Sequence, residues 1–181
     1  MPRTKTYLTP AEYAVLGLLR QKPAYGYELQ RQLSADNGLA RVCRVEPAMV
    51  YAVLKSLSGL EFIDGEWDRS DYPPKAVYAL TEAGEVEFER WLRLPVGRMR
   101  QVRYDFLIKL YFAMAEDKAL ARELVEAQID VCRAYADEVE QELGAAEASL
   151  FDAIVLQSKA SAARLTLEWL EQCKRTLAGL E

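Results

Sequence analysis

Histidine is absent from all 181 residues of this chain. Imidazole is the commonest general base, the commonest metal ligand and the usual partner of a nucleophilic serine or cysteine. Its absence excludes most hydrolase mechanisms and most zinc sites. The motifs G-x-G-x-x-G, G-x-S-x-G and the P-loop are missing as well. We therefore predict that the chain is not an enzyme, that it has no catalytic residue, and that it binds no metal or cofactor.

Cysteine is scarce, and long apolar runs are missing. Cys43, Cys132 and Cys173 are odd in number and far apart, which excludes a disulfide framework and a C-x-x-C motif. No segment approaches the ~20 consecutive apolar residues that span a bilayer, and the N-terminus lacks the apolar core of an export signal. These absences predict a cytoplasmic protein without a membrane partner.

A basic surplus is also missing from the chain as a whole, because its formal net charge is −5. The charge is unevenly distributed. Residues 1–60 contain eight basic and four acidic side chains, residues 61–95 four basic and nine acidic, and residues 96–181 eleven basic and fifteen acidic. A protein that binds nucleic acid needs a local excess of positive charge. Only the first 60 residues provide one.

Three short helices are predicted in that positive segment. The capping box Thr9-Pro10-Ala11-Glu12 starts a helix that ends near residue 21. A second helix is expected from about residue 25 to 37. Pro47 opens the third, in which Val50, Leu54 and Leu57 recur on one face.

A β-hairpin is predicted directly after the third helix. Residues 62–67 and 76–80 have the composition of strands, and the connection between them contains two prolines and several short polar residues. Thr81 caps a fourth helix that runs to about residue 93. Three short helices followed by a hairpin is the order of a winged helix-turn-helix domain.

The remainder of the chain is predicted to be helical, over about residues 100–115, 117–143 and 146–177. At 1.5 Å per residue the last two helices would be about 40 and 48 Å long, which exceeds the diameter of a domain of this size. Their apolar faces therefore need a partner, most simply a second copy of the chain. We predict a mainly α fold with a small two-stranded β-hairpin wing, a DNA-binding domain over residues 1–95 and a helical dimerisation domain over residues 96–181.

Four short motifs in the first domain resemble, in order and spacing, the N-terminal domain of PadR-family transcriptional regulators. They are Leu16-Gly17-Leu18-Leu19, Tyr25-Gly26-Tyr27-Glu28-Leu29, Val50-Tyr51-x-x-Leu54-Lys55-x-Leu57, and Pro74-Lys75-x-x-Tyr78-x-Leu80-Thr81-x-x-Gly84. The segment Phe106-Leu107-x-Lys109-Leu110 and the helices after it resemble the helical dimerisation region of the longer family members. The resemblance implies a homodimeric regulator, usually a repressor, that reads a pseudo-palindromic DNA operator.

The resemblance also implies which residues contact DNA. The third helix would be the recognition helix, and wing residues would reach phosphate or the minor groove. The implied DNA-binding residues are Tyr25, Pro47, Ala48, Met49, Tyr51, Lys55, Arg69 and Lys75. Two alternatives stay open at this point, because Tyr51 is also placed to pack against the wing and Tyr25 to hold the second helix against the first.

Three positions depart from the family pattern. Glu46 stands where a small hydroxyl residue commonly precedes the helix-three proline, and Met49 stands where serine or threonine is common. Glu46 would repel a nearby phosphate, whereas Met49 favours apolar contact with thymine methyl groups. Glu61 occupies a position where glycine usually ends this helix. These departures affect the expected operator sequence more than the expected fold.

Two further interpretations remain from the sequence. Aromatic residues of the later helices are candidates for the pocket of a small aromatic effector, although aromatics at helical spacing are more often core residues. The candidates are Trp91, Phe106, Tyr135 and Trp169. The alternative to a DNA-binding regulator is a winged-helix module for dimerisation or protein interaction without specific DNA binding, because a surplus of four positive charges is also found on ordinary solvated surfaces.

Overall fold

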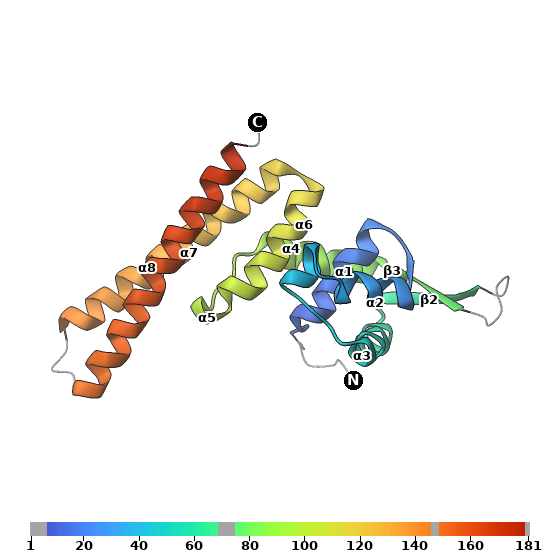
Figure 1. Cartoon of the computed structure of the whole chain (residues 1–181), viewed down its shortest axis with the longest axis horizontal. Coiled ribbons are helices and arrows are strands. Elements are labelled where there is room, and N and C mark those ends of the chain that lie inside the picture. The colour runs from blue at the N-terminus through green and yellow to red at the C-terminus, as the bar shows by residue number, and fades with distance from the viewer. Residues whose placement is uncertain (1–6, 69–74, 146–148, 180–181) are drawn as a thin grey trace. The chain divides into compact units, whose positions relative to one another are not determined.

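The computed structural model describes residues 7–68, 75–145 and 149–179. The chain packs as two compact units, Met1–Leu92 and Arg93–Glu181 (Figure 1). Helices predominate, and a small antiparallel sheet lies in the first unit. The predicted fold class, mainly helical with a winged helix-turn-helix, is confirmed.

The helices of the first unit begin where local signals place them. At the start of α1, the backbone N–H of Thr9 donates to Oε2 of Glu12 at 2.7 Å, and the N–H of Glu12 donates to Oγ1 of Thr9 at 3.3 Å. This pair is the predicted capping box. The helices are α1 (Pro10–Gln21), α2 (Gly26–Ser34), a 3₁₀ turn (Gly38–Arg41), α3 (Pro47–Gly59) and α4 (Glu82–Arg93).

The sheet has three strands rather than the predicted two. The hairpin strands β2 (Ile63–Asp68) and β3 (Lys75–Leu80) pair antiparallel, and the short strand β1 (Ala24–Tyr25) adds to β3, so that the order is β1-β3-β2. The sequence analysis assigned Tyr25 to the second helix, because a two-residue strand has no periodicity to detect. Pairing with β3 fixes its conformation instead.

A Schellman motif ends α3 and directs the chain into β2. The N–H of Phe62 donates to the carbonyl of Leu57 at 3.1 Å, and the N–H of Glu61 donates to that of Ser58 at 3.0 Å. The motif requires a left-handed residue at the position of Glu61, whose φ is +61°. The hydroxyl of Thr81, at the start of α4, donates to the carbonyl of Glu61 at 2.8 Å. The departure noted at this position therefore has a backbone cost.

Replacing Glu61 by glycine is expected to raise the free energy of unfolding by about 1 kcal/mol, because glycine adopts positive φ without a clash at Cβ. Urea denaturation followed by circular dichroism measures the change. The matched control is Glu123→Gly, which places glycine at an exposed position inside a helix and should lower stability by about 1 kcal/mol. An unchanged or lower denaturation midpoint for Glu61→Gly would contradict the assignment of strain.

Helices α1 and α4 pack against each other in the first unit. The ring of Tyr13 stacks on Trp91, with centroids 4.3 Å apart and planes 8° apart, and its hydroxyl donates to Oε1 of Glu87 at 2.7 Å. Burial, together with the bond to Glu87, raises the pKa of the Tyr13 phenol well above its usual value. Arg20 forms an ion pair with Glu85 at 2.8 Å. These contacts join the first and last helices of the unit.

The second unit consists of helices alone among the residues described. They are α5 (Met99–Gln101), a π-helical turn (Val102–Phe106), α6 (Leu107–Glu116), α7 (Lys118–Ala145) and α8 (Leu150–Ala178). The sequence analysis ended α7 before Gly144, but the helix includes this residue. It also began the last helix near residue 146, whereas α8 begins at Leu150 with Ser149 as its cap, through a bond from the N–H of Asp152 at 3.2 Å.

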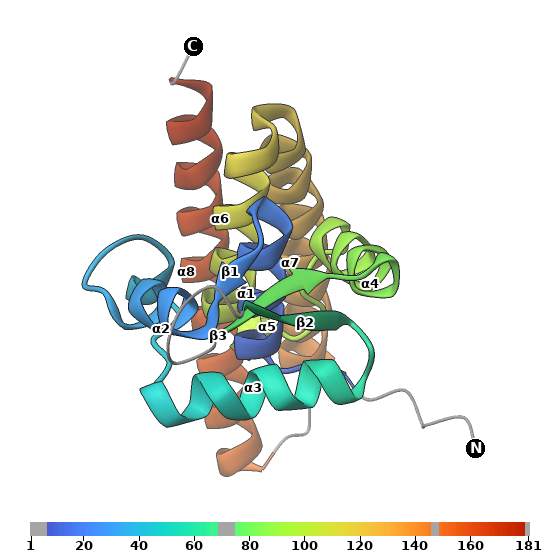
Figure 2. The same ribbon diagram turned by 90° about the vertical axis from the view of Figure 1, so that its right-hand side faces the viewer.

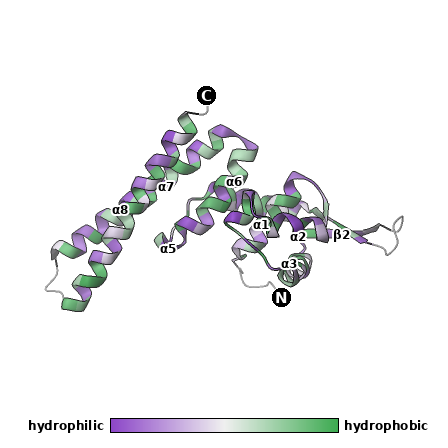
Figure 3. Cartoon of the chain, in the orientation of Figure 1, coloured by the Kyte–Doolittle hydropathy of each residue, from purple (hydrophilic) through white to green (hydrophobic). Residues whose placement is uncertain are grey.

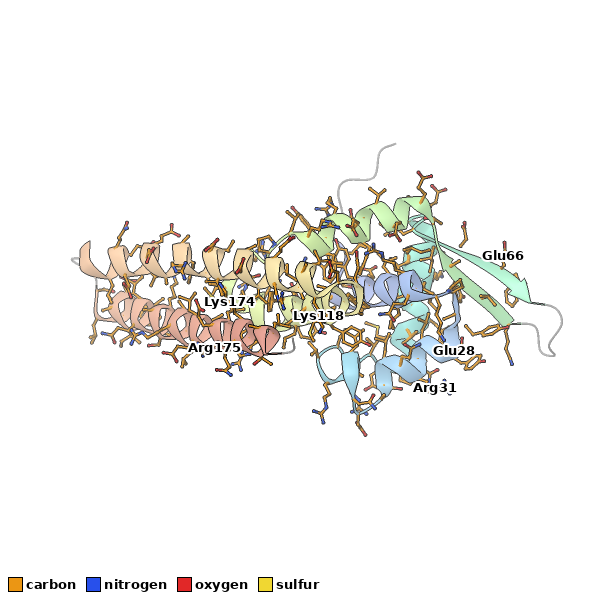
Figure 4. All side chains as sticks on the ribbon, turned by 90° about the horizontal axis from the view of Figure 1, so that it is seen from above. Glu28, Arg31, Glu66, Lys118, Lys174 and Arg175 are labelled. Atoms are coloured by element: carbon orange, nitrogen blue, oxygen red, sulfur yellow. The ribbon has the colours of Figure 1, made fainter. Side chains whose placement is uncertain are left out.

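Polar contacts accompany the apolar packing of the second unit. The ammonium of Lys174 on α8 lies 2.9 Å from Oε1 of Glu126 on α7, and Lys174 is labelled in Figure 4. The amide of Gln128 is fully buried, accepts from the N–H of Val96 at 2.7 Å and donates to its carbonyl at 3.0 Å. This pair of bonds satisfies both backbone groups of Val96 and ties the segment before α5 to α7.

Within the described ranges, the helices are too polar or too short to cross a bilayer. Over the same residues, His, Cys, Asp and Glu side chains form no group of three or more that is suited to a metal ion.

Candidate nucleic-acid interface

Helix α3 presents one buried and one exposed face. Val50, Val53, Leu54 and Leu57 are at most 7% exposed and pack into the first unit. The opposite face contains the positions predicted to contact DNA. The exposed residues of α3 are Pro47, Ala48, Met49, Tyr51, Ala52, Lys55, Ser56, Ser58 and Gly59. Helix α3 contains no carboxylate, so a phosphate approaching this face meets no negative side chain of the helix itself.

Two large side chains are prominent on this face. Met49 is 59% exposed and Tyr51 is 51% exposed. The Tyr51 ring lies against the start of α2, because a Cβ built on Gly26 would be 3.0 Å from its Cε1. Tyr51 is therefore positioned by packing and still exposes half of its surface. Met49 and Tyr51 are two positions apart, so they lie on opposite sides of the exposed face of the helix.

Tyr25 and Lys75 lie together where the wing meets α2. Tyr25 is half-buried, and its backbone N–H donates to Oε2 of Glu28 at 2.9 Å; Glu28 is labelled in Figure 4. The Tyr25 ring stacks on the Tyr27 ring, with centroids 5.4 Å apart. The ammonium of Lys75 lies 5.5 Å from the centroid of the Tyr27 ring, within the range of a cation–π interaction. The sequence analysis did not include Tyr27 among the site residues. Only the pairing of β1 with β3 brings the two segments together.

A second contact missed by the sequence analysis joins α3 to α1. The hydroxyl of Ser56 donates to Oε1 of Glu12 at 2.7 Å, while Oε2 of the same carboxylate accepts the backbone N–H of Thr9. The capping box of α1 thus also contacts the candidate recognition helix. Ser56 and Glu12 are 44 residues apart in the sequence, so local patterns contain no signal for this bond.

Two further positions named in the sequence analysis are Glu46, before α3, and Arg69, in the wing. Glu46 is exposed at the N-cap of α3 and, within the described part of the chain, its side chain makes no capping hydrogen bond. Its carboxylate is therefore directed to solvent near the helix start. Arg69 lies outside the described residues.

Part of the positive charge in the first 60 residues is already paired. Arg20 forms ion pairs with α4, and Arg44 lies 3.1 Å from Asp36. Arg31 is exposed on α2 (Figure 4), and Lys55 is exposed on α3. The charge available to a ligand at α3 is smaller than the count of basic residues indicates.

The four candidate effector residues fall into separate packing groups. Phe106 is fully buried and meets Trp169 edge-on, with ring centroids 5.8 Å apart and planes at 86°. Tyr135 packs against a cluster formed by Val139, Leu156 and Ala160.

Trp91 lies in the first unit and stacks on Tyr13. The structure therefore brings Phe106 and Trp169 together, while the ring contacts of Trp91 and Tyr135 are made with other residues.

Comparisons with known proteins cover most of the chain in two parts. Residues 15–90 match the family model described as "Transcriptional regulator PadR-like family". Residues 102–178 match the one described as "Virulence activator alpha C-term". The first match includes the helix-turn-helix and the wing, and the second includes α6 and both long helices.

Individual relatives are more distant. The chain is 27% identical over 119 residues to the negative transcriptional regulator PadR of Bacillus subtilis strain 168, an alignment that covers 65% of this chain and 64% of that relative. Among solved structures, B. subtilis PadR in complex with operator DNA has a TM-score of 0.46 and 23% identity, with 92% of this chain and 98% of the other covered. The PadR-like regulator BC1756 of Bacillus cereus has a TM-score of 0.43 and 23% identity, with 96% and 99% covered.

Proposed function

We propose that this chain is a homodimeric, DNA-binding repressor. It belongs to the PadR-like family of transcriptional regulators, and these proteins are not enzymes. In this proposal two copies of α3 enter successive major grooves of a pseudo-palindromic operator, and the wings contact the flanking backbone or minor grooves. Pro47, Ala48, Met49, Tyr51 and Lys55 face the bases and phosphates.

The exposed face of α3 is the observation that supports DNA binding most directly. It combines a cation, Lys55, with two large exposed side chains, Met49 and Tyr51, and has no carboxylate within the helix. The N-terminus of a helix adds partial positive charge. Lys55 supplies a phosphate contact, whereas Met49 supplies apolar contact with thymine methyl groups. Tyr25 and Lys75, at the junction of wing and α2, lie close to the backbone in this arrangement.

Helix α8 supports the dimer, because it has apolar residues on two faces. One face is buried, and the other exposes Leu150 (80%), Phe151 (71%), Ile154 (54%) and Leu165 (66%) to solvent. At 100° per residue these four side chains fall within an arc of about 100°. Figure 3 shows apolar bands recurring along α8. We refer to these four residues as the α8 stripe.

A second copy of the chain is the simplest partner for the α8 stripe. The small residues Ser158 and Ser161 lie on the same arc between Ile154 and Leu165, so two such helices can approach closely. A two-fold contact of stripe with stripe buries the same apolar surface on both copies. A symmetric dimer also provides the two copies of α3 that a palindromic operator requires.

A small aromatic effector is proposed at Phe106 and Trp169. The Trp169 indole is half-buried and meets the Phe106 ring edge-on. Lys109, which is buried, follows Phe106 by about one helical turn. Burial raises the pKa of Asp105, which lies on the π-helical turn, and the charge of Lys109 partly offsets this effect. Phe106 and Lys109 are buried, so Trp169 is the ring of this group that a ligand can reach from solvent.

Binding to a fragment of the protein's own upstream DNA across a salt series tests the proposed function. We expect one dimer per site, a Kd of about 10⁻⁸ M or tighter at physiological salt, and a log Kd that rises linearly with log salt. The alternative, a winged-helix interaction module, predicts weak binding that does not distinguish the upstream fragment from unrelated DNA of equal length.

A further inference from the structure

An exposed tryptophan lies on the wing. Trp67 is 66% exposed although it belongs to a regular strand, β2. Its partner across the hairpin is Ala76, whose methyl group is too small to cover an indole. A tryptophan in such a position contributes little to the fold of the isolated chain and exposes a large apolar surface to water.

The two faces of the hairpin differ sharply in polarity. Side chains alternate along a strand, so Ile63, Gly65 and Trp67 share one face of β2, and Asp64 and Glu66 lie on the other. The cross-strand partners of the first face are also uncharged: Leu80, Tyr78 and Ala76. The wing therefore has an apolar face ending in Trp67. The opposite face, which we call the acidic face, contains Asp64, Glu66 and also Lys75; Glu66 is labelled in Figure 4.

Packing at Gly65 keeps the apolar face flat. A Cβ built on Gly65 would be 3.1 Å from Cε1 of Tyr78, so the Tyr78 ring lies across the position where another side chain would stand. The face then continues from buried Ile63, through Tyr78, to exposed Trp67. A flat aromatic surface of this kind fits an elongated partner better than a compact ligand.

The apolar face lies on the α3 side of the hairpin. Ile63 is 1% exposed and packs into the core of the first unit. The face of the sheet that contains Ile63 is therefore the face that the helices cover. Figure 2 looks along the hairpin and shows α3 running beneath β2, and Figure 1 shows the hairpin extending beyond the helices. The exposed side of α3 points away from this core. A duplex lying against α3 is therefore on the side of Trp67, and Asp64 and Glu66 point away from it. Lys75 shares the face of these carboxylates, but its ammonium extends to the Tyr27 ring of α2.

From this arrangement we propose that Trp67 is a DNA-contacting residue of the wing, and that its indole packs on the deoxyribose edge of the groove next to the one α3 enters. The inference rests on the proposed DNA-binding function and adds an uncharged contact to it. Apolar side chains are established contacts to sugars and base steps in minor grooves. Because the contact is uncharged, it adds affinity without adding to the salt dependence.

Fluorescence and affinity together test the role of Trp67. The full-length chain is titrated with its upstream DNA fragment in three forms: unsubstituted, Trp67→Phe and Trp67→Ala. We expect Trp67→Ala to weaken binding about tenfold and Trp67→Phe about threefold, with the slope of log Kd against log salt unchanged. Tryptophan emission should change when DNA covers the indole, and this change should be lost in Trp67→Phe.

Trp91→Phe is the matched control, because it removes a tryptophan that packs on Tyr13 and Phe88 instead of lying on the wing, and it should keep the DNA-induced change in emission. Circular dichroism checks that each variant is folded, which the exposure of Trp67 leads us to expect. Two results would contradict the proposed role of Trp67 and leave the proposed function standing, provided that the unsubstituted chain binds DNA. The first is a Kd of Trp67→Ala within twofold of the unsubstituted Kd, and the second is a DNA-induced emission change that persists in Trp67→Phe. If the unsubstituted chain binds no upstream fragment, the proposed function itself is wrong.

Discussion

Replacing both Ile154 and Leu165 of the α8 stripe by glutamate is expected to convert the proposed dimer into a monomer and to weaken operator binding at least about 100-fold. Both side chains are more than half exposed in the single chain, so the substitutions remove little packing from the monomer. In a two-fold contact, however, four carboxylates would be forced into an apolar interface. A monomer binds one half-site and loses the gain from linking two contacts, which is commonly 10²- to 10⁴-fold.

Sedimentation equilibrium and DNA titration measure the two effects separately. The charge-matched control is Gln141→Glu with Gln157→Glu, since both glutamines are exposed on α7 and α8 and lie outside the α8 stripe. The control should remain dimeric and keep its operator affinity within about threefold. A stripe variant that stays dimeric would show that another surface joins the copies. One that becomes monomeric but binds the full operator as before would separate dimerisation from DNA recognition.

Lys55→Ala is expected to have the second largest effect, a loss of about 30-fold in operator affinity at low salt. Each half of the dimer loses one charged contact with a phosphate. At an exposed site such a contact is worth about 1 kcal/mol, so the two lost contacts amount to about 2 kcal/mol. The slope of log Kd against log salt should become shallower by about 1.8, because two phosphate contacts are lost per dimer. Lys55 is exposed, so protein stability should change little.

Lys22→Ala is the control for this measurement. Lys22 is also exposed and basic, but it follows the C-terminus of α1 instead of lying on α3. It should leave both affinity and salt slope nearly unchanged. Equal effects of the two variants would mean that the domain attracts DNA through its overall charge and that α3 is not the recognition helix.

The parts of the fold that could be predicted from the sequence are those with local signals. The capping box at Thr9 and Glu12, the proline at position 47 and the apolar spacing of α3 each depend on residues within one or two turns. The same spacing separated the exposed positions Met49, Tyr51 and Lys55 from the buried ones. The existence of the wing followed from strand composition on both sides of a polar, proline-containing connection.

The features that could not be predicted depend on contacts between distant residues. Strand β1 exists because it pairs with β3, more than 50 residues later. The bond between Ser56 and Glu12, and the position of Lys75 over Tyr27, are consequences of tertiary packing. The exposure of Trp67 depends on where the helices stop covering the hairpin. A strand composition alone does not contain that information.

The acidic face of the wing also bears on how fast the protein finds DNA. Asp64 and Glu66 project from β2 on the face opposite Trp67, whereas Glu85, Glu87 and Glu89 of α4 are paired with Arg20 or Arg90. Charge separated in this way gives the unit an electric dipole, and the field of a polyanion turns a dipole before contact. In the proposed complex, collisions that present these carboxylates to DNA would be repelled, and those that present α3 would be accelerated. We therefore expect the association rate to gain from this charge separation at low salt and to lose the gain as the Debye length shortens.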